Sequence, residues 1–361
     1  MPNQKISKAK SIKRTKTIVE LVIAAVLVLL AVHFIKNALT DSKEVGRTDY
    51  ETSDIEVSIP EVEPATDPNA IIYSNQTVNT RDKFYGDLIL VNNDHQYFQT
   101  GDEDLVNINE LNNENGVDIF YAIEDTYTIS RQAYQPMVDM VTDYYNKYQD
   151  DTLTIYGSFR TTEFQQSLYD DDLAQTGEEE STRVAKAGYS EHETGLAFDF
   201  SETVNYDYNG EGTQAWINQN CYKYGFIVRY NADKVALTQI QEEPWHFRYV
   251  GIPHAYYLTK NNLCLEEYTD LIRQSYPYEG SHLEFTDENG SSYEVYFVAS
   301  DDAAETTSVP VPSGLKYDIS GNNIDGFVVT VYKDQTGAAA APAATEAPTT
   351  TTEAESAELA E

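Results

Sequence analysis

Residues 190–200 read SEHETGLAFDF, and this stretch contains the pattern from which the central part of the fold is inferred. It begins as a glycine-containing loop around His192 and ends in residues that alternate between apolar and other types. Alternation with a period of two is typical of a strand that buries one face, so Asp199 should point from the opposite face. A carboxylate held beside a packed core needs a partner.

A second histidine stands in a similar setting at residues 242–251, which read EEPWHFRYVG. Pro244 disfavours a regular helix, and aromatic residues alternate around His246, so this segment is also predicted to be a strand. Taken singly, a histidine beside aromatic residues is most simply explained as a hydrogen-bonded core residue. Two such histidines, each with a carboxylate at short spacing, favour a joint role in one domain.

Together these residues have the composition of a catalytic zinc site. The imidazoles of His192 and His246 and the carboxylate of Asp199 would hold one Zn²⁺ and leave a fourth position for water. A base must then accept a proton from that water, and Glu243 is the candidate because it lies three residues before His246. The other histidines outside the apolar N-terminal run are left unassigned: His95, His254 and His282.

Residues 84–333 alternate between helical and strand patterns and are predicted to form one folded domain. Apolar residues recur at helical spacing in residues 131–148, and residues 161–177 read as a capped helix that ends near Gly177. The predicted class is α+β, with a small, mostly antiparallel sheet flanked by helices. Further strands are predicted at LILV (residues 88–91), 153–160 and 226–230, with a hairpin turn at Asn289 and Gly290.

Upstream of this domain, the sequence predicts a membrane anchor. Residues 18–35 form an apolar run that, as a helix, would span roughly 27 Å, about one bilayer core. Residues 1–17 are basic, which places the N-terminus in the cytoplasm and the catalytic domain outside the cell. A cleaved signal peptide is the alternative, although the run is long for one and no small-residue cleavage site follows it.

Charge and composition define the remaining segments. Residues 36–83 have the composition of an acidic stalk, and the Ala-, Pro-, Thr- and Glu-rich residues 334–361 are predicted to be a disordered tail. The chain has 24 Lys and Arg against 60 Asp and Glu, a net charge of −36, which argues against nucleic acid as a partner. Whether Cys221 and Cys264 form a disulfide is left open.

Two motifs resemble those of the VanY-type D-alanyl-D-alanine carboxypeptidases. Residues 190–199 fit S-x-H-x-x-G-x-A-x-D, and residues 243–246 fit E-P-W-H. The resemblance implies that the two motif histidines and Asp199 bind zinc and that Glu243 is the catalytic base. The ligand chemistry above reaches the same assignment independently.

A third segment resembles the family less closely. GSFRTTEFQ, residues 157–165, places Arg160 and Gln165 where the family has an arginine and a glutamine, but Gly-Ser-Phe before the arginine departs from the family's Ser-Gly-Tyr. The resemblance implies that Arg160 binds the substrate carboxylate or stabilises the developing oxyanion, and that Gln165 and Ser190 contact substrate. The alternatives are a surface ion pair for Arg160 and a turn or cap role for Ser190.

The family resemblance implies a zinc-dependent enzyme that removes the C-terminal D-alanine from peptidoglycan stem peptides by attack of zinc-bound water. An L,D-carboxypeptidase acting on tetrapeptides and a peptidoglycan endopeptidase share this chemistry, and the sequence leaves them open. A catalytically inactive cell-wall binding module is the alternative outside the enzyme class. The expected partners are the stem peptide and, through residues 18–35, the membrane.

Overall fold

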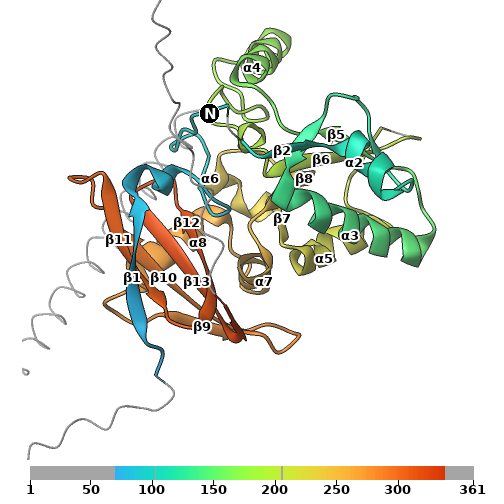
Figure 1. The fold of residues 1–361 in the computed structure, drawn as a ribbon. Helices are drawn as coiled ribbons and strands as arrows, with labels where there is room; N and C mark the ends of the chain where they lie inside the picture. Colours follow the sequence, from blue (N-terminus) through green and yellow to red (C-terminus); the bar gives the residue numbers. More distant parts are fainter. Residues whose placement is uncertain (1–69, 102, 205, 338–361) are drawn as a thin grey trace, which may run out of the picture. The chain divides into compact units, whose positions relative to one another are not determined.

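The computed structural model describes residues 70–101, 103–204 and 206–337, and the part from residue 105 to residue 249 contains a five-stranded sheet (Figure 1). Neighbouring strands pair antiparallel except for one parallel pair at the edge, so the prediction of a mostly antiparallel sheet with helices is confirmed. The strand order is β3 (Tyr121–Ala122), β5 (Leu153–Gly157), β6 (Ala197–Glu202), β8 (Glu243–Tyr249) and β7 (Phe226–Tyr230).

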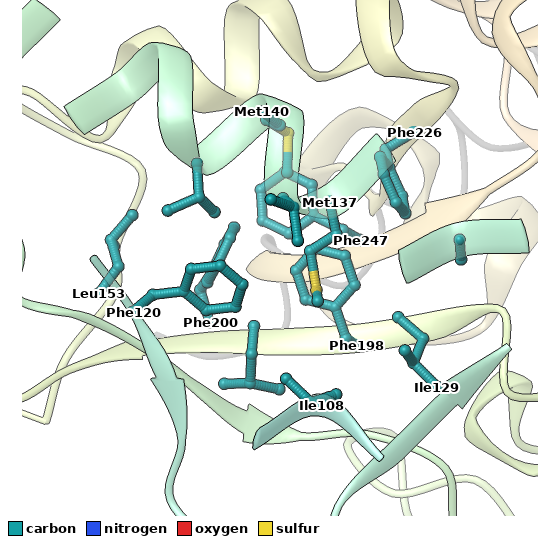
Figure 2. Packing of buried hydrophobic residues seen from close by; sticks show 14 of the residues in the cluster. Ile108, Phe120, Ile129, Met137, Met140, Leu153, Phe198, Phe200, Phe226 and Phe247 are labelled. Atoms are coloured by element: carbon teal, nitrogen blue, oxygen red, sulfur yellow. The ribbon is translucent and has the colours of Figure 1, made fainter. Parts of the chain in front are cut away.

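One face of this sheet is covered by α3 (Arg131–Tyr148), and the two together form the largest aromatic core of the domain (Figure 2). Phe198 of β6 stacks on Phe247 of β8 with ring centroids 5.6 Å apart, and both side chains are fully buried. The alternation in each strand therefore buries one face, as predicted. Asp199 and His246 consequently project from the other face.

Capping residues determine both ends of the helix that follows β5. The side chain of Thr161 accepts a hydrogen bond from the Phe164 backbone at the start of α4 (Thr162–Thr176), and Gly177 ends it with φ 72°. Both boundaries agree with the prediction. The remaining elements of this part are β2 (Leu105–Asn107), α2 (Ile108–Asn115), β4 (Thr128–Ser130), η2 (Glu191–Thr194), α5 (Ala215–Asn220), η3 (Cys221–Tyr224), η4 (Ala232–Lys234) and α6 (Val235–Thr238).

A second, four-stranded antiparallel sheet follows the five-stranded sheet along the chain, and of it only the hairpin at Asn289 and Gly290 was predicted. It shares a separate apolar core with α7 (Ile252–Lys260) and α8 (Leu265–Ser275). A two-stranded sheet, β1 (Tyr73–Asn79) with β11 (Thr306–Pro312), accompanies it. The four strands, in sheet order, are β12 (Leu315–Gly321), β13 (Gly326–Thr336), β10 (Ser292–Ala299) and β9 (Leu283–Thr286).

Two sequence predictions differ from the structure. Residues 88–91 are buried but form no strand, because loops and side chains bind their backbone: Leu90 N donates to Asn322 O and Arg248 donates to Ile89 O. The folded region also starts earlier than residue 84, since β1 and η1 (Thr80–Phe84) lie within the segment predicted to be stalk. Pairing of β1 with a strand far along the chain gives no local signal.

Four predicted segments lie wholly or partly outside the described residues: the basic segment at 1–17, the anchor at 18–35, the stalk up to residue 69 and the tail from residue 338. Among the helices that the structure does describe, none has the length and apolarity needed to cross a bilayer. Cys221 and Cys264 are both buried free thiols, so they form no disulfide with each other.

Candidate metal centre and active site

The pairing of β6 with β8 brings the predicted ligands together. Asp199 lies directly opposite His246 in the antiparallel register, so the two side chains share one face of the sheet. His192 comes from η2, the short helix that leads into β6. His246 Nδ1 lies 3.0 Å from Asp199 Oδ1, and His192 Nε2 lies 3.2 Å from Asp199 Oδ2. One ligand atom from each residue lies within 4.8 Å of the other two, and all three residues are buried.

The charge states of these groups suit a cation. Burial lowers the pKa of His192 to about 4, which leaves a neutral imidazole. Burial alone would raise the pKa of Asp199, but the neighbouring His192 and His246 hold it well below its usual range. Burial would lower the pKa of His246, but the neighbouring carboxylates of Asp199 and Glu191 raise it to about 9. The surrounding carboxylates therefore favour a positive charge at this point.

The donor set also fits zinc. Two imidazole nitrogens and one carboxylate oxygen are the ligands of many catalytic zinc sites. Asp199 Oδ1 is buried yet accepts no hydrogen bond of good geometry from any residue that the structure describes, so an acceptor atom is available within the cluster. We conclude that these three residues could hold one metal ion with a position left for water or substrate.

Residues on β5 and just after it support two of the ligands. Gly157 lies opposite Asp199 on the neighbouring strand, and a Cβ atom there would lie 2.3 Å from Asp199 Oδ2. Ser158 O lies 2.8 Å from His192 Nδ1, so that nitrogen donates the hydrogen bond and Nε2 remains free for a metal. The Gly-Ser pair, which departs from the family pattern, thus has a specific place beside the ligands.

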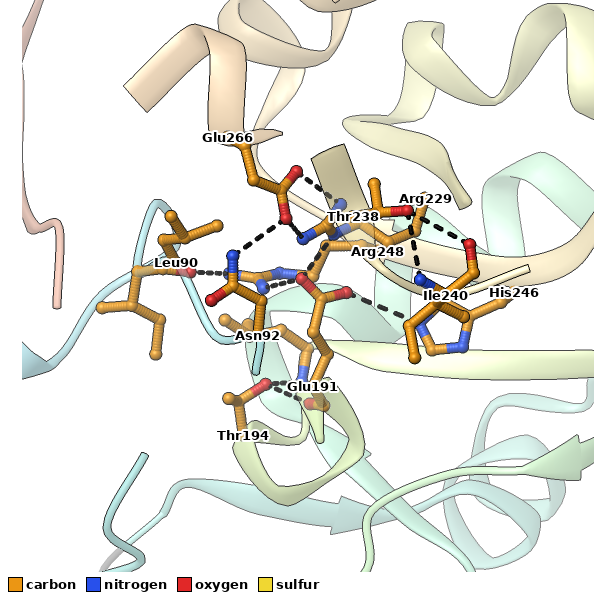
Figure 3. A network of polar contacts seen from close by, with 12 residues as sticks. Leu90, Asn92, Glu191, Thr194, Arg229, Thr238, Ile240, His246, Arg248 and Glu266 are labelled. Carbon is orange, nitrogen blue, oxygen red and sulfur yellow. Dashed lines mark hydrogen bonds and ion pairs between the residues drawn. The ribbon is translucent and has the colours of Figure 1, made fainter. Parts of the chain in front are cut away.

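The other supporting group is a buried ionic network that the sequence analysis missed (Figure 3). Glu191 Oε1 accepts hydrogen bonds from Arg229 Nε and Arg248 Nη1, both at 2.8 Å, and Glu191 Oε2 faces His246 Nε2 at 3.5 Å. Arg229 also forms a two-pronged pair with Glu266, at 2.6 and 2.9 Å. The period-two spacing of Arg248 from His246 was the available signal, because it places both on one face of β8.

The proposed base lies beside the ligands. Glu243 Oε2 is 3.7 Å from His246 Nδ1, and its side chain is 14% exposed. Burial raises the pKa of Glu243 to about 7, against the opposing effect of the His246 charge. A carboxylate with such a pKa can both accept and return a proton near neutral pH.

Arg160 also lies at the cluster, and its side chain is 19% exposed. Its Nη2 is 3.1 Å from Asp199 Oδ2, and its Nη1 donates to Gln165 Oε1 at 3.2 Å. The Gln165 amide donates in turn to Ala185 O at 2.7 Å, so in this structure Gln165 orients Arg160. Ser190 is buried at the start of η2 and forms no side-chain cap bond there.

A separate cavity of about 730 Å³ lies between the second sheet and residues near the end of β8. None of the three predicted ligands, nor Glu243, lines it. Its walls include Asp87, Leu105, Tyr249, Tyr293, Asp318 and Tyr332.

Comparisons with known proteins agree with this geometry. The family VanY, D-alanyl-D-alanine carboxypeptidase, matches residues 127–252, a range that includes every predicted site residue. A D-alanyl-D-alanine carboxypeptidase of Enterococcus faecium is 34% identical over 266 residues, which cover 72% of this chain and 80% of that protein. The bifunctional D-Ala-D-Ala dipeptidase and carboxypeptidase VanXYC of Enterococcus gallinarum is 35% identical over 131 residues, which cover 34% of this chain and 69% of that protein.

A solved structure is similar over the same extent. The vancomycin-resistance D,D-dipeptidase VanXYg, determined in complex with a D-Ala-D-Ala phosphinate analogue, superposes with a TM-score of 0.62 at 29% identity. The match covers 72% of this chain and 99% of that chain. The similarity therefore extends beyond the five-stranded sheet.

Proposed function

This chain belongs to the VanY-type D-alanyl-D-alanine carboxypeptidase family, and from that membership we propose that it is a zinc enzyme that releases the terminal D-alanine of peptidoglycan stem peptides. The observation that carries the proposal is the buried convergence of His192 Nε2, His246 Nδ1 and Asp199 beside Glu243. Family membership supports the carboxypeptidase activity, and the geometry supports the metal and the base.

His192, Asp199 and His246 would hold the zinc ion. When bound, zinc would polarise the scissile carbonyl and lower the pKa of a water ligand. The two imidazoles are fixed by groups behind them, since Ser158 O holds one ring and Glu191 faces the other.

Glu243 would carry the proton through the reaction. It accepts a proton from the attacking water as the water oxygen bonds to the carbonyl carbon before the terminal residue. It then gives that proton to the leaving amine as the C–N bond breaks, so one D-alanine is released and the enzyme is restored. The pKa of about 7 suits both directions of this transfer.

Arg160 would bind the negative charge of the substrate. Its planar guanidinium can pair with the terminal carboxylate or with the oxygen that becomes negative during attack. Gln165 accepts a hydrogen bond from Nη1 of Arg160, and Nη2 is directed at Asp199, one of the proposed metal ligands. Ser190, next to Glu191 at the start of η2, is proposed as a further substrate contact.

We also propose that residues 18–35 anchor the chain in the cell membrane as a single span. Their apolarity and the basic residues before them support a cytoplasmic N-terminus and a catalytic domain outside the cell, beside its substrate. Protease digestion of intact cells should remove the catalytic domain if this orientation is right. Protection of that domain would contradict it.

The decisive experiment uses the purified full chain with defined muropeptides. We expect one zinc per chain and the mass loss of one alanine from a pentapeptide that ends in D-Ala-D-Ala, read by mass spectrometry. Trimming of tetrapeptides alone would indicate an L,D-carboxypeptidase, and cleavage of cross-linked dimers would indicate an endopeptidase. Zinc binding without any release would indicate a binding module.

A further inference from the structure

The two oxygens of Glu191 have different surroundings. Oε1 accepts both arginine hydrogen bonds described above, from Arg229 and Arg248, at 2.8 Å each. Oε2 is buried and accepts no hydrogen bond from the part of the chain that the structure describes. The side chains of Glu191 and of both arginines are 0% exposed, so bulk solvent does not reach this oxygen.

The atom that faces this oxygen is an imidazole nitrogen that likewise lacks a hydrogen-bond partner in the described part of the chain. His246 Nε2 is also buried and has no hydrogen-bond partner among the described residues, and it lies 3.5 Å from Glu191 Oε2. A buried donor and a buried acceptor that lack hydrogen-bond partners lower the stability of the fold. A small decrease in the distance between these two atoms would form a hydrogen bond. In that bond Nε2 must carry the hydrogen, because a carboxylate only accepts.

From this geometry we infer that Glu191 is a positioning residue that keeps the hydrogen of His246 on Nε2, so that Nδ1 presents its lone pair to the metal. The inference rests on the proposed function, since it assumes that His246 is a ligand. Nδ1 is the atom that faces Asp199, at 3.0 Å, so the two ring nitrogens have opposite tasks. A carboxylate behind a ligand histidine also makes the ligand more basic.

The arginines fix the direction of the Glu191 carboxylate. Arg229 is held by Glu266 at the start of α8, and Glu266 also accepts from Asn92 at 3.1 Å. Arg248 donates to the backbone oxygens of Asp87 and Ile89, at 3.0 and 2.8 Å. The two carboxylates of this network balance the charges of its two guanidinium groups. This pairing of charges allows the network to stay buried. Segments far apart in the chain thereby hold the metal ligand.

The substitution Glu191→Gln tests the tautomer directly, because the two ends of an amide differ. Two arginine N–H groups point at the Oε1 position, so the amide oxygen should settle there. The amide NH₂ group would then face His246 Nε2 and donate to it, which forces the ring hydrogen onto Nδ1 and opposes metal binding. The matched control is Glu266→Gln, which removes the same charge from the same network without touching His246.

The measurement is the zinc dissociation constant of the full chain, by competition with a chromophoric chelator, together with thermal melting of the metal-free variants. We expect Glu191→Gln to weaken zinc binding by about 10- to 100-fold and Glu266→Gln by less than about threefold, although both lower the melting temperature. Equal losses in the two variants, or no loss in Glu191→Gln, would overturn the inference. A parent chain that binds no zinc would instead overturn the proposed function.

If Glu191→Gln shows no cooperative melting transition, the pair Glu191→Asp and Glu266→Asp gives the same comparison. Each keeps its charge but withdraws its carboxylate by one methylene group. Weaker zinc binding in Glu191→Asp alone would support the inference, and equal binding in the two would refute it.

Discussion

Replacement of Glu243 by glutamine should remove most of the turnover while leaving the metal in place. Glutamine keeps the size of the side chain but cannot accept a proton at neutral pH. The glutamate has a pKa of about 7 and is therefore about half ionised at pH 7. A positioned general base contributes roughly 10²- to 10⁴-fold to rate, or about 2.7 to 5.5 kcal/mol of barrier.

The assay is release of D-alanine from a purified pentapeptide, with the zinc content of each variant measured in parallel. We expect kcat/KM to fall by about 10²- to 10⁴-fold with one zinc retained, because Glu243 is not one of the three ligands. Glu242→Gln is the matched control, since its side chain is exposed and adjacent in sequence. A Glu243→Gln enzyme that turns over as fast as the Glu242→Gln enzyme would refute the assigned base.

Three further substitutions follow from the structure. Gly157→Ala should weaken zinc binding by about tenfold or more in chelator competition, because its Cβ would lie 2.3 Å from Asp199 Oδ2; unchanged binding would contradict this close approach. Arg160→Lys should lower kcat/KM by about tenfold or more in steady-state assays, since lysine lacks the planar fork, and an unchanged value would argue against substrate contact. Burial lowers the pKa of His254 to about 3, below its unfolded value of 6.5. The unfolded state therefore binds the proton more readily, and the protein loses stability as the pH falls below 6.5. Urea titrations from pH 7 to pH 4 should therefore show that the free energy of unfolding falls less steeply in His254→Gln than in the parent chain, by up to about 1.4 kcal/mol per pH unit. Equal slopes in the two chains would contradict the assignment.

The parts of the fold that the sequence predicted are those with local causes. The strands at β6 and β8 follow from alternation, and α4 follows from its Thr161 cap and from Gly177. The two short motifs identify the three ligand candidates, but these side chains lie together because β6 pairs with β8, which is a long-range contact. The two strands and the helix are each set by residues within about one element of each other.

The features that the sequence did not predict depend on long-range partners. β1 pairs Tyr73 with Pro312, and no local pattern identifies a partner so far along the chain. Residues 88–91 have the composition of a buried strand, yet Arg248 and Asn322 bind their backbone in place of a neighbouring strand. The buried pairing of Glu191 with Arg229 and Arg248 was equally hidden, because a single acidic residue in a loop gives no indication that two arginines will enclose it.

The aromatic core determines the geometry of the proposed metal centre from the opposite face of the sheet. In the register of β6 and β8, Phe198 lies opposite Phe247, and Asp199 lies opposite His246. A slip of one residue would turn His246 toward the core and Phe247 toward the site, because side chains alternate strictly along a strand. The slip would place Phe247 against the charged groups of the site, and it would bury an imidazole in the aromatic core without a partner, which is costly. The ligands therefore meet because the phenylalanines behind them can pack in only this register.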